Sequence, residues 1–401
     1  MKIGIVVDNE LNSDIRVLRE IGILKEQEFE IFVLCFGFFK KYHDPLSQVN
    51  ITRINIPRKL RDILFFLLNT IPVYEWLWTI KIKRFILHYG LESLHVHDLY
   101  MARAAYYGIK AANCKIPMIL DLHENYPFTV TTYNWTKGLW RSFISRPEDW
   151  KKKEREYLGY ADRIVVLSTD FRDTLLERYP ELGSENLVVL PNVPDLSQTE
   201  YQNKGVATNP FKQELPILFY YGVIAERRGI FDALEVFINL VKEGYPVNFL
   251  LIGPVDKKDM PLFSRLTGLE VLVDRIHYIP WIESKKFPSY LGISDICLAP
   301  FHKNPQHESG VANKVYDYML GGKPVIASNC KPQQNLIEKY NCGLIFENIT
   351  EFHDAIVSLL NDKSLREKMG ENGKKAIMRE YNTGIVKENL ILLYKTFIFK
   401  M

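Results

Sequence analysis

The side chains best suited to chemistry gather in one stretch of the C-terminal half, from Phe301 to Ser328. An apolar run typical of a buried strand precedes this stretch, and after a polar loop a helical pattern starts near Val311. Gly310 lets backbone amides approach a ligand closely, and the free N–H groups at a helix start favour an anion. Asn313 and Lys314 fall in that first turn. The stretch therefore predicts a phosphate site at the start of a helix.

A carboxylate accompanies this lysine. Asp317 lies three residues after Lys314, so both side chains lie on one face of the predicted helix. A lysine suits the charge of a phosphate and a carboxylate suits a sugar diol, so the pair fits a ligand that carries both groups. The alternative is structural: Lys314 and Asp317 form a surface ion pair, and Gly310 is only a turn residue.

A second cationic loop follows the apolar run at 216–222. After Gly222 the chain carries Arg227 and Arg228 directly before Gly229, where a helical pattern opens. Arginines at a helix entrance suit bidentate phosphate binding. Two solvated arginines on a turn are the alternative.

Polar pairs end two predicted strands in the N-terminal half. His97 and Asp98 follow one strand, and His123 and Glu124 follow another. Because the carboxyl ends of parallel strands share one edge of a sheet, these pairs are expected to point into the same crevice. Together with His95 they are all metal-ligand types, so a metal site is the rival interpretation. No HExxH or similar spacing and no Asp-x-Asp supports it, and we expect no metal.

These residues need a scaffold that brings distant loops together. Short apolar runs alternate with longer amphipathic ones, which is the pattern of βαβ units and predicts an α/β fold with doubly wound parallel sheets. Ligands bind such sheets at the carboxyl ends of the strands. The predicted strands are 2–7, 30–35, 51–56, 94–97, 117–121, 163–167, 187–190, 216–222, 247–252, 275–279, 294–299, 324–328 and 343–346. The helices predicted in the C-terminal half are 229–243, 284–291, 311–320, 333–339, 350–380 and 385–398.

The length of 401 residues exceeds the size at which one hydrophobic core keeps growing, so we expect two domains. A polar span with several prolines and glycines separates two α/β series and is typical of a linker. We predict an N-terminal domain at 1–192, a linker at 193–214, a C-terminal domain at 215–384 and a final apolar helix at 385–401.

Composition excludes several classes of protein. The net charge of +3 is too small to predict nucleic acid as a partner. The five cysteines form no C-x-x-C pair, and such scattered cysteines are typical of buried side chains in a reducing compartment. The first residues form a short apolar strand rather than a signal peptide, and no run reaches the roughly 18 apolar residues of a spanning helix. We therefore expect a cytoplasmic protein.

One N-terminal stretch combines basic and aromatic residues. Residues 58–84 contain six basic side chains among large apolar ones that include Trp76 and Trp78. This mixture is typical of a segment in a membrane interface, and a second such stretch runs over 140–153. A core helix with a charged outer face explains the first stretch equally well. A peripheral location at the inner face of the plasma membrane therefore stays open.

The stretch that begins at Phe301 resembles the signature region of GT-B glycosyltransferases, especially those of the family 4 type. In that family a glutamate, a glycine-containing turn and a second acidic residue precede a Met-x-x-Gly-x-Pro-Val run. The matching residues in the second half of this pattern are Asp317, Met319, Gly322, Pro324 and Val325.

The acidic residues depart from the family pattern. Glu308 stands one residue farther from the second acid than is usual, and Ser309 occupies the expected spacing. The second acid is Asp317 rather than a glutamate. The departure bears on the sugar-contacting role of Glu308 more than on the role of Asp317.

The loop with two arginines resembles the family's phosphate loop. Arg228 stands where a lysine is usual, and Val223 stands where the family has an arginine. Arg227 could supply the missing charge. The resemblance implies that these arginines, Lys314 and the helix start bind the diphosphate of a nucleotide sugar.

The N-terminal half carries weaker matches. His97 matches the family position whose imidazole touches the donor sugar, and His123 with Glu124 resembles a companion motif that faces the acceptor. An Asp-Ile-Arg-Val that recurs in some subgroups starts at Asp14. The residues expected on the acceptor side are Asp14, Arg16, Asp98, His123 and Glu124.

The resemblance implies two further sets of site residues. The expected catalytic residues are His97, Arg228, Lys314 and Glu308. The expected donor-binding residues are Gly222, Arg227, Arg228, Gly310, Val311, Asn313, Lys314 and Asp317. No cofactor is expected, because the nucleotide sugar is itself the substrate.

The resemblance also implies a fold and a reaction. The fold is GT-B, with two Rossmann-like doubly wound domains that face a cleft. The expected enzyme is a retaining, metal-independent hexosyltransferase. It moves a hexosyl unit from a nucleotide diphosphate sugar to a glycan or lipid-linked acceptor in cell-surface polysaccharide assembly. The alternatives are an enzyme on the same fold that is similar to the UDP-GlcNAc 2-epimerases, and a non-catalytic glycan-binding or scaffold protein.

Overall fold

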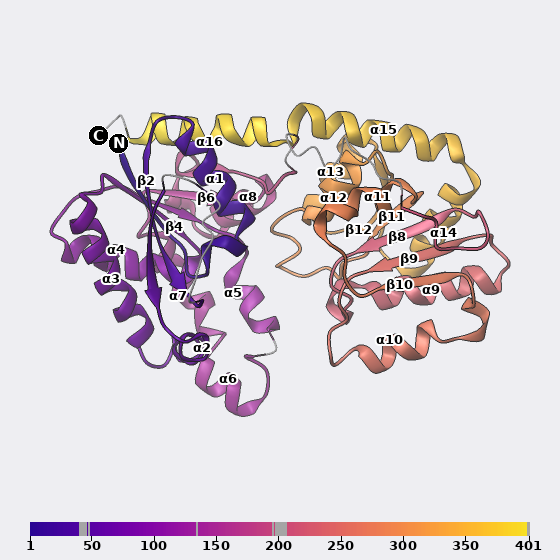
Figure 1. Ribbon diagram of the computed structural model, residues 1–401, viewed down its shortest axis with the longest axis horizontal. Helices are drawn as coiled ribbons and strands as arrows, with labels where there is room; N and C mark the ends of the chain where they lie inside the picture. The colour runs from indigo at the N-terminus through magenta and orange to yellow at the C-terminus, as the bar shows by residue number, and fades with distance from the viewer. Residues whose placement is uncertain (40–45, 47–48, 134, 195, 197–206, 399–401) are drawn as a thin grey trace. The chain divides into compact units, whose positions relative to one another are not determined.

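The computed structural model describes residues 1–39, 46, 49–133, 135–194, 196 and 207–398. The chain folds as two compact units: unit 1 comprises Met1–Asn192 and Val386–Met401, and unit 2 comprises Val193–Ile385. Each unit is an α/β domain around one parallel sheet, as Figure 1 shows. The linker predicted at 193–214 lies partly outside the described residues.

Unit 1 is built on a seven-stranded parallel sheet with the order β3-β2-β1-β4-β5-β6-β7. The order reverses between β1 and β4, which pair with Ile5 opposite His95. Its strands are β1 (Lys2–Val6), β2 (Glu30–Gly37), β3 (Asn50–Asn55), β4 (Ser93–His97), β5 (Met118–Asp121), β6 (Arg163–Val166) and β7 (Leu187–Val189). Its helices are α1 (Ile15–Lys25), α2 (Arg58–Phe66), α3 (Val73–Tyr89), α4 (Ala102–Ala111), α5 (Tyr126–Thr129), α6 (Leu139–Ser145), α7 (Asp149–Leu158), α8 (Thr169–Arg178) and most of α16 (Thr383–Ile398).

Unit 2 has a six-stranded parallel sheet with the order β10-β9-β8-β11-β12-β13. The order reverses between β8 and β11, and open α/β sheets bind ligands at the carboxyl ends of strands at such a reversal. Its strands are β8 (Ile217–Tyr221), β9 (Asn248–Ile252), β10 (Ile276–Ile279), β11 (Ile296–Ala299), β12 (Val325–Ser328) and β13 (Gly343–Phe346). Its helices are α9 (Ile230–Lys242), α10 (Met260–Thr267), α11 (Phe287–Gly292), α12 (Asn313–Leu320), α13 (Lys331–Tyr340), α14 (Ile349–Asn361) and α15 (Lys363–Glu380).

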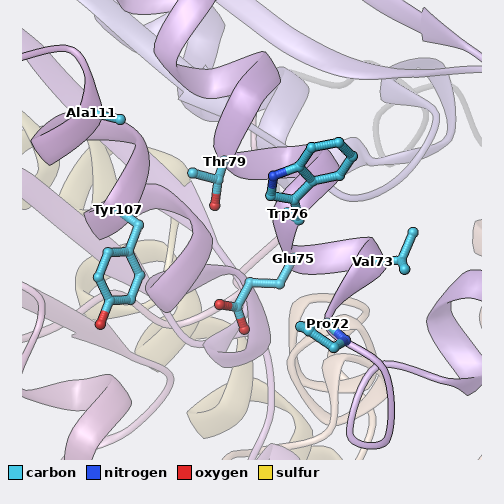
Figure 2. Close-up of a pocket in the computed structure, with 7 residues that line it drawn as sticks. All are labelled: Pro72, Val73, Glu75, Trp76, Thr79, Tyr107 and Ala111. Atoms are coloured by element: carbon cyan, nitrogen blue, oxygen red, sulfur yellow. The ribbon is translucent and has the colours of Figure 1, made fainter.

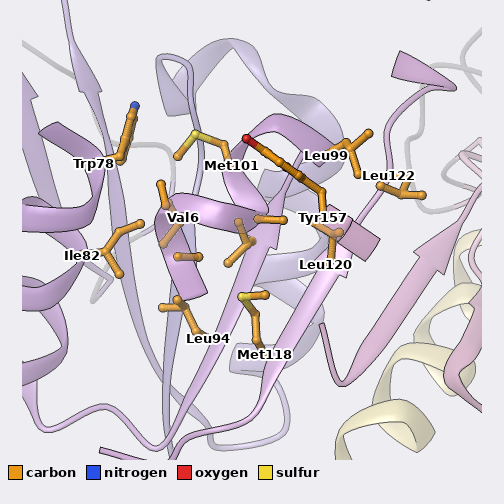
Figure 3. Packing of buried hydrophobic residues seen from close by; sticks show 14 of the residues in the cluster. Val6, Trp78, Ile82, Leu94, Leu99, Met101, Met118, Leu120, Leu122 and Tyr157 are labelled. Carbon is orange, nitrogen blue, oxygen red and sulfur yellow. The ribbon is translucent and has the colours of Figure 1, made fainter. Parts of the chain in front are cut away.

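The core of unit 1 explains why its strands read as continuous apolar runs. Val6, Leu94 and Leu120 come from three neighbouring strands, and Trp78 and Ile82 of α3 pack against them (Figure 3). All five side chains have an exposed fraction of 0%. A parallel sheet is covered on both faces, so its strands need no polar alternation. Truncating a buried side chain as large as Trp78 costs about 3–5 kcal/mol, so α3 is a core element.

Helix α3 decides part of the question left open for residues 58–84. It buries Tyr74, Trp78, Ile82 and Phe85 at helical spacing, so this part of the stretch packs internally. Helix α2, in contrast, has no buried residue. None of the helices in the described part of the chain is both long and apolar enough to cross a membrane.

The helix predictions in unit 2 need three corrections. Residues 350–380 form two helices rather than one, because Asp362 leaves the helical conformation and its side chain caps α15 by accepting from the N–H of Leu365 at 2.8 Å. Helix α10 was not predicted. The helix expected near Val311 begins at Asn313. The predicted strands are all present, with ends within two residues of the predicted ones.

Candidate functional site

The amine of Lys314 is buried in unit 2. Lys314 is the second residue of α12, whose start has no side-chain cap. Its Nζ has no hydrogen-bond partner among the residues that the structure describes, so it is not bonded to Asp317 in a surface ion pair. Nζ lies 3.6 Å from the centre of the Tyr220 ring. Burial, and then the positive charge of Arg228, holds the pKa of Lys314 well below its usual value.

The side chains of Arg228 and Lys314 both lie near the ring of Phe301. The Cζ of Arg228 lies 5.4 Å from the centre of the Phe301 ring, and the Nζ of Lys314 lies 5.2 Å from it. Phe301 is buried and stands two residues after the end of β11. A cation near an aromatic ring gains about 1 kcal/mol, which is less than the cost of burying an unpaired ammonium. An anion at this place would therefore be stabilised by both cations.

Two glycines let the loops after β8 and β11 approach closely. Gly222 has φ of 135°, and a Cβ added there would lie 2.9 Å from the Nζ of Lys314. Gly229 has φ of 66°, and a Cβ added there would lie 1.6 Å from the carbonyl oxygen of Pro300. A side chain at Gly229 would push its loop away from Pro300, whereas a side chain at Gly222 would displace the Lys314 amine. The donor-binding role of Gly222 stays a prediction, and the steric role of Gly229 required the structure.

Arg227 differs from Arg228 in its surroundings. Arg227 forms an ion pair with Asp256, which follows β9. Its positive charge is therefore offset within unit 2, whereas the field of Arg228 reaches Lys314. The role of Arg227 in replacing the charge missing at Val223 stays a prediction.

Glu308 contacts the start of a helix. Its Oε1 accepts a hydrogen bond from the backbone N–H of Lys331, the first residue of α13, at 2.9 Å. Acidic groups stabilise helix starts in this way. This contact gives Glu308 a structural role in unit 2, and its sugar-contacting role stays a prediction.

The other predicted donor residues lie on the loop before α12 and on α12 itself. Gly310 and Val311 are partly buried in the loop. Asn313 is exposed in the first turn of α12, and Asp317 is partly buried one turn later. The structure thus collects the predicted donor residues of α12 next to Lys314, while Glu308 turns to α13.

His307 is a neighbour of this site that the sequence did not predict. Its ring lies 4.7 Å from that of Phe301, and its Nδ1 lies 2.8 Å from the carbonyl oxygen of His302. Burial lowers the pKa of His307 to about 4, so the ring is neutral at pH 7 and adds no third cation. The only sequence signal for the contact between His307 and Phe301 was a phenylalanine two residues after a buried strand.

Unit 1 holds a buried cluster at the carboxyl ends of β4 and β5. The Nδ1 of His95 lies 2.8 Å from the hydroxyl of Tyr394, and the Nδ1 of His97 lies 2.9 Å from the Nε2 of His123. The rings of His95 and His97 stack with centres 4.6 Å apart. Asp121 is the strand partner of His97. Because Tyr394 belongs to α16, the last helix contributes a side chain to this cluster.

Burial keeps the histidines of the cluster neutral. It lowers the pKa of His95 to about 4 and that of His123 to about 3, and it lowers the pKa of His97 well below the usual value. Burial, followed by the charge of Asp121, raises the pKa of Glu20 to about 8. The cluster therefore has few net charges at neutral pH.

Arg16 supplies the cation of the cluster. Its Nη2 lies 2.8 Å from both carboxylate oxygens of Asp121, and its Nε lies 3.0 Å from the Oε1 of Glu20. Arg16 has an exposed fraction of only 8%. The residue predicted on the acceptor side is therefore buried and ion-paired. Asp14 caps α1 by accepting from the N–H of Val17 at 3.1 Å. The acceptor-side roles of both residues stay predictions.

The cluster contains metal-ligand types. Glu20, His95, His97 and Asp121 each place one ligand atom within 4.8 Å of the others. Of the ligands weighed from the sequence, only the two histidines belong to this group. The guanidinium of Arg16 already donates to both carboxylates, and a divalent ion beside it would meet a like charge. These contacts favour an ion-paired scaffold over a metal centre.

Asp98 and Glu124 lie near each other among tyrosines. Asp98 has φ of 72°, a backbone conformation that costs a non-glycine residue energy. The hydroxyl of Tyr100 donates to Asp98 at 3.1 Å, and that of Tyr133 donates to Glu124 at 2.7 Å. Burial raises the pKa of both carboxyls, and the charge of Glu124 is the second cause at Asp98. The structure thus brings together two of the predicted acceptor-side residues.

A separate pocket of about 680 Å³ opens beside α3 and α4 (Figure 2). Its wall is mostly apolar, with Glu75 and Thr79 as polar members. The lining residues are Pro72, Val73, Glu75, Trp76, Thr79, Tyr107 and Ala111. None of the predicted site residues lines it.

Two family models match the chain. The model described as Glycosyltransferase Family 4 matches residues 17–198, and the model described as Glycosyl transferases group 1 matches residues 203–376. The first match falls in the N-terminal sheet domain and the second in the C-terminal one. The chain therefore belongs to the GT-B glycosyltransferases of the family 4 type.

Individual relatives are distant. The chain is 24% identical over 251 residues to the alpha-D-kanosaminyltransferase of Streptomyces kanamyceticus, with 61% of this chain and 63% of the relative covered. It is 25% identical over 253 residues to the capsular polysaccharide biosynthesis glycosyltransferase CapM of Staphylococcus aureus, with 59% and 62% covered. The chain thus spans about six-tenths of the length of these relatives. The crystal structure of Anabaena Alr3699/HepE in complex with UDP has a TM-score of 0.69 at 12% identity, over 99% of this chain and 100% of that one.

Proposed function

We propose that this chain transfers a hexosyl unit from a nucleotide diphosphate sugar to a glycan or lipid-linked acceptor. The observation that carries the proposal is the buried amine of Lys314, which has no hydrogen-bond partner among the described residues and shares the Phe301 ring with Arg228. A diphosphate supplies the negative charge and the acceptor oxygens that the Lys314 amine lacks among the described residues. Support also comes from the UDP in the Anabaena structure and from the role of CapM in capsular polysaccharide biosynthesis.

The proposed reaction needs no protein nucleophile. The bond between the anomeric carbon and the diphosphate oxygen breaks, and the acceptor oxygen bonds to the same face of that carbon, so the configuration is retained. The acceptor proton leaves with the departing diphosphate. Lys314, Arg228 and the backbone amides at the start of α12 stabilise the charge that develops on the diphosphate. Because these cations meet that charge, the proposal includes no metal ion.

The proposal gives the histidines of unit 1 a positioning role. His97 is neutral, and its Nδ1 is engaged with His123 at 2.9 Å, which fixes the orientation of the ring. A fixed neutral imidazole can hydrogen-bond a sugar hydroxyl. A charged imidazole would be repelled by the nearby Arg16. We assign His97 to the donor sugar, and Asp98 and Glu124 to the hydroxyl groups of the acceptor.

A thermal-shift screen against UDP-, GDP-, ADP- and dTDP-sugars tests the donor part of the proposal. We expect the sugars of one base to raise the melting temperature of the wild type and to leave Lys314→Ala unchanged. A screen in which no nucleotide sugar has an effect, or in which Lys314→Ala shifts as far as the wild type, would contradict the proposal.

Product analysis by NMR then separates the reaction classes. A transferase forms a new glycosidic bond with the anomeric configuration of the donor and releases the nucleoside diphosphate. An epimerase-like enzyme changes the sugar without an acceptor, and a binding protein leaves the donor intact. If the acceptor is lipid-linked, the reaction takes place at the inner face of the plasma membrane.

A further inference from the structure

Helix α6 turns three large apolar side chains toward solvent. The exposed fraction is 92% for Leu139, 81% for Trp140 and 78% for Phe143, the highest among the large hydrophobic residues that the structure describes. Leu139 and Phe143 are four residues apart and share one helix face, next to Trp140. We call these three residues the α6 patch. A contiguous apolar surface of this kind marks an interaction site.

Polar contacts, rather than the α6 patch, hold the helix in place. Nδ2 of Asn69 donates to the carbonyl oxygens of Ser145 and Arg146, at 3.0 Å each. The hydroxyl of Thr70 donates to the carbonyl oxygen of Ile144. These bonds fix the C-terminal end of α6 through its backbone, while Leu139, Trp140 and Phe143 stay exposed.

Asn69 and Thr70, which hold α6, belong to a second segment with exposed apolar side chains. Asn69 and Thr70 connect α2, which has no buried residue, to α3. Around this connection the exposed fraction is 56% for Ile63, 45% for Ile71 and 65% for Trp76. Figure 1 shows α2 and α6 near each other. The segment that anchors α6 therefore exposes apolar side chains of its own.

The segment that contains the α6 patch is basic. Residues 137–153 contain six lysines and arginines and only two acids. Both acids are paired: Glu148 lies 2.6 Å from Lys151, and Asp149 lies 2.9 Å from Arg146. Residues 137–153 therefore carry a net positive charge.

We propose that the α6 patch docks on an anionic lipid bilayer, with its three side chains inserted at the level of the headgroups. Trp, Phe and Leu beside lysines and arginines are typical of helices in a membrane interface. The positive charge matches the anionic leaflet of a bilayer. A second copy of this chain would bring a like-charged surface to the patch, so charge favours lipid over self-association. The proposal stands independently of the proposed transfer reaction.

Co-sedimentation with vesicles tests this docking. We expect the wild type to bind vesicles of phosphatidylcholine with phosphatidylglycerol, and to bind vesicles of phosphatidylcholine alone at least about tenfold more weakly. The triple variant Leu139→Ser, Trp140→Ser, Phe143→Ser should lose about tenfold or more of the binding to the anionic vesicles, because the inserted area is gone. The substituted side chains are exposed, so the triple variant is expected to fold.

A matched control uses an exposed tryptophan elsewhere. Trp281 has an exposed fraction of 72%, and Trp281→Ser should bind the anionic vesicles like the wild type. Equal binding by the triple variant and the wild type, or no binding of the wild type to anionic vesicles, would overturn the proposal. So would a dimer, seen by light scattering, that the triple variant breaks while vesicle binding is unchanged. The thermal shift with nucleotide sugars should survive in the triple variant, so failure of the docking and failure of the transfer proposal are distinguishable.

Discussion

Lys314 and Arg16 are both cations in buried surroundings, and the two units treat them differently. Arg16 donates to the carboxylates of Asp121 and Glu20, whereas the amine of Lys314 has no hydrogen-bond partner among the described residues. Removing a cation from water costs several kcal/mol unless a partner offsets it. A paired buried cation stabilises the scaffold, whereas an unpaired one lowers the stability of the folded protein. From this difference we infer that the partner of Lys314 comes from outside the chain.

The buried histidines of unit 1 also differ from the loops of unit 2 in how their polar groups are engaged. In unit 1 the Nδ1 atoms of His95 and His97 are engaged by Tyr394 and His123, whereas the Nε2 atoms of both rings have no hydrogen-bond partner among the described residues. In unit 2 a glycine at 222 leaves room beside the lysine amine. We infer that unit 1 orients groups that meet neutral sugar, and that unit 2 provides charge.

The largest expected effect breaks the paired side of the comparison. Arg16→Leu leaves Asp121 buried without its cation, and we expect the free energy of unfolding to fall by about 3–5 kcal/mol. Urea unfolding of the wild type and the variant measures this difference.

The control for Arg16→Leu removes the orphaned carboxylate as well. The double variant Arg16→Leu, Asp121→Leu should recover much of the lost stability, because two apolar side chains leave no unpaired charge between them. A loss below about 1 kcal/mol in the single variant would show that Arg16 is not a buried partner of Asp121 in solution.

The next largest effect breaks the unpaired side. Lys314→Met removes a charge but no partner, so the ligand-free protein should be at least as stable as the wild type. The affinity for the nucleoside diphosphate should fall by about 100-fold, which corresponds to about 2.7 kcal/mol. Isothermal calorimetry measures the affinity of the wild type and of Lys314→Met for the nucleoside diphosphate. Lys303 is an exposed lysine on the loop before α12, so Lys303→Met is the matched control and should bind normally.

The pH dependence of stability sharpens the comparison further. The pKa of Lys314 is lowered in the folded state, so between that lowered value and the unfolded value of about 10.4 the folded protein binds fewer protons than the unfolded chain. The contribution of Lys314 to stability therefore rises with pH across this window. We expect the stability of the wild type to approach that of Lys314→Met as pH rises. A constant difference between the two would mean that the amine is well solvated.

The smallest expected effect concerns α16. Tyr394→Phe removes the hydroxyl that lies 2.8 Å from the Nδ1 of His95 and leaves the ring in place. We expect a loss of about 1 kcal/mol in the free energy of unfolding. The pKa of His95 should move too, and NMR titration of the imidazole detects it. An unchanged His95 titration would contradict a direct bond between the two side chains.

Local patterns predicted the fold well, because each buried strand and most helices leave a short-range signature. The continuous apolar runs gave the strands of both sheets, and the spacing of Lys314 and Asp317 placed both residues on α12. The break at Asp362 was missed, because the apolar periodicity continues across the capping residue into α15.

The partners of charged side chains could not be predicted, because they come from distant parts of the chain. Arg16 meets Asp121, which lies 105 residues away, and Glu308 meets the start of α13. In the same way, the sequence could not tell that the Lys314 amine would lie against the Tyr220 ring with no hydrogen-bond partner in the part of the chain that the structure describes. The packing of α3 also depends on the sheet, so its aromatic residues were equally compatible with a membrane interface.

The most direct test of an unpaired Lys314 is proton uptake when a nucleoside diphosphate binds. Calorimetry at about pH 9, in buffers with different heats of ionisation, counts the protons taken up, and at this pH the phosphates are already fully ionised. We predict that UDP, or whichever diphosphate binds in the screen, draws a proton to the amine in the wild type and not in Lys314→Met. Equal affinity and equal proton uptake in the two proteins would contradict the account.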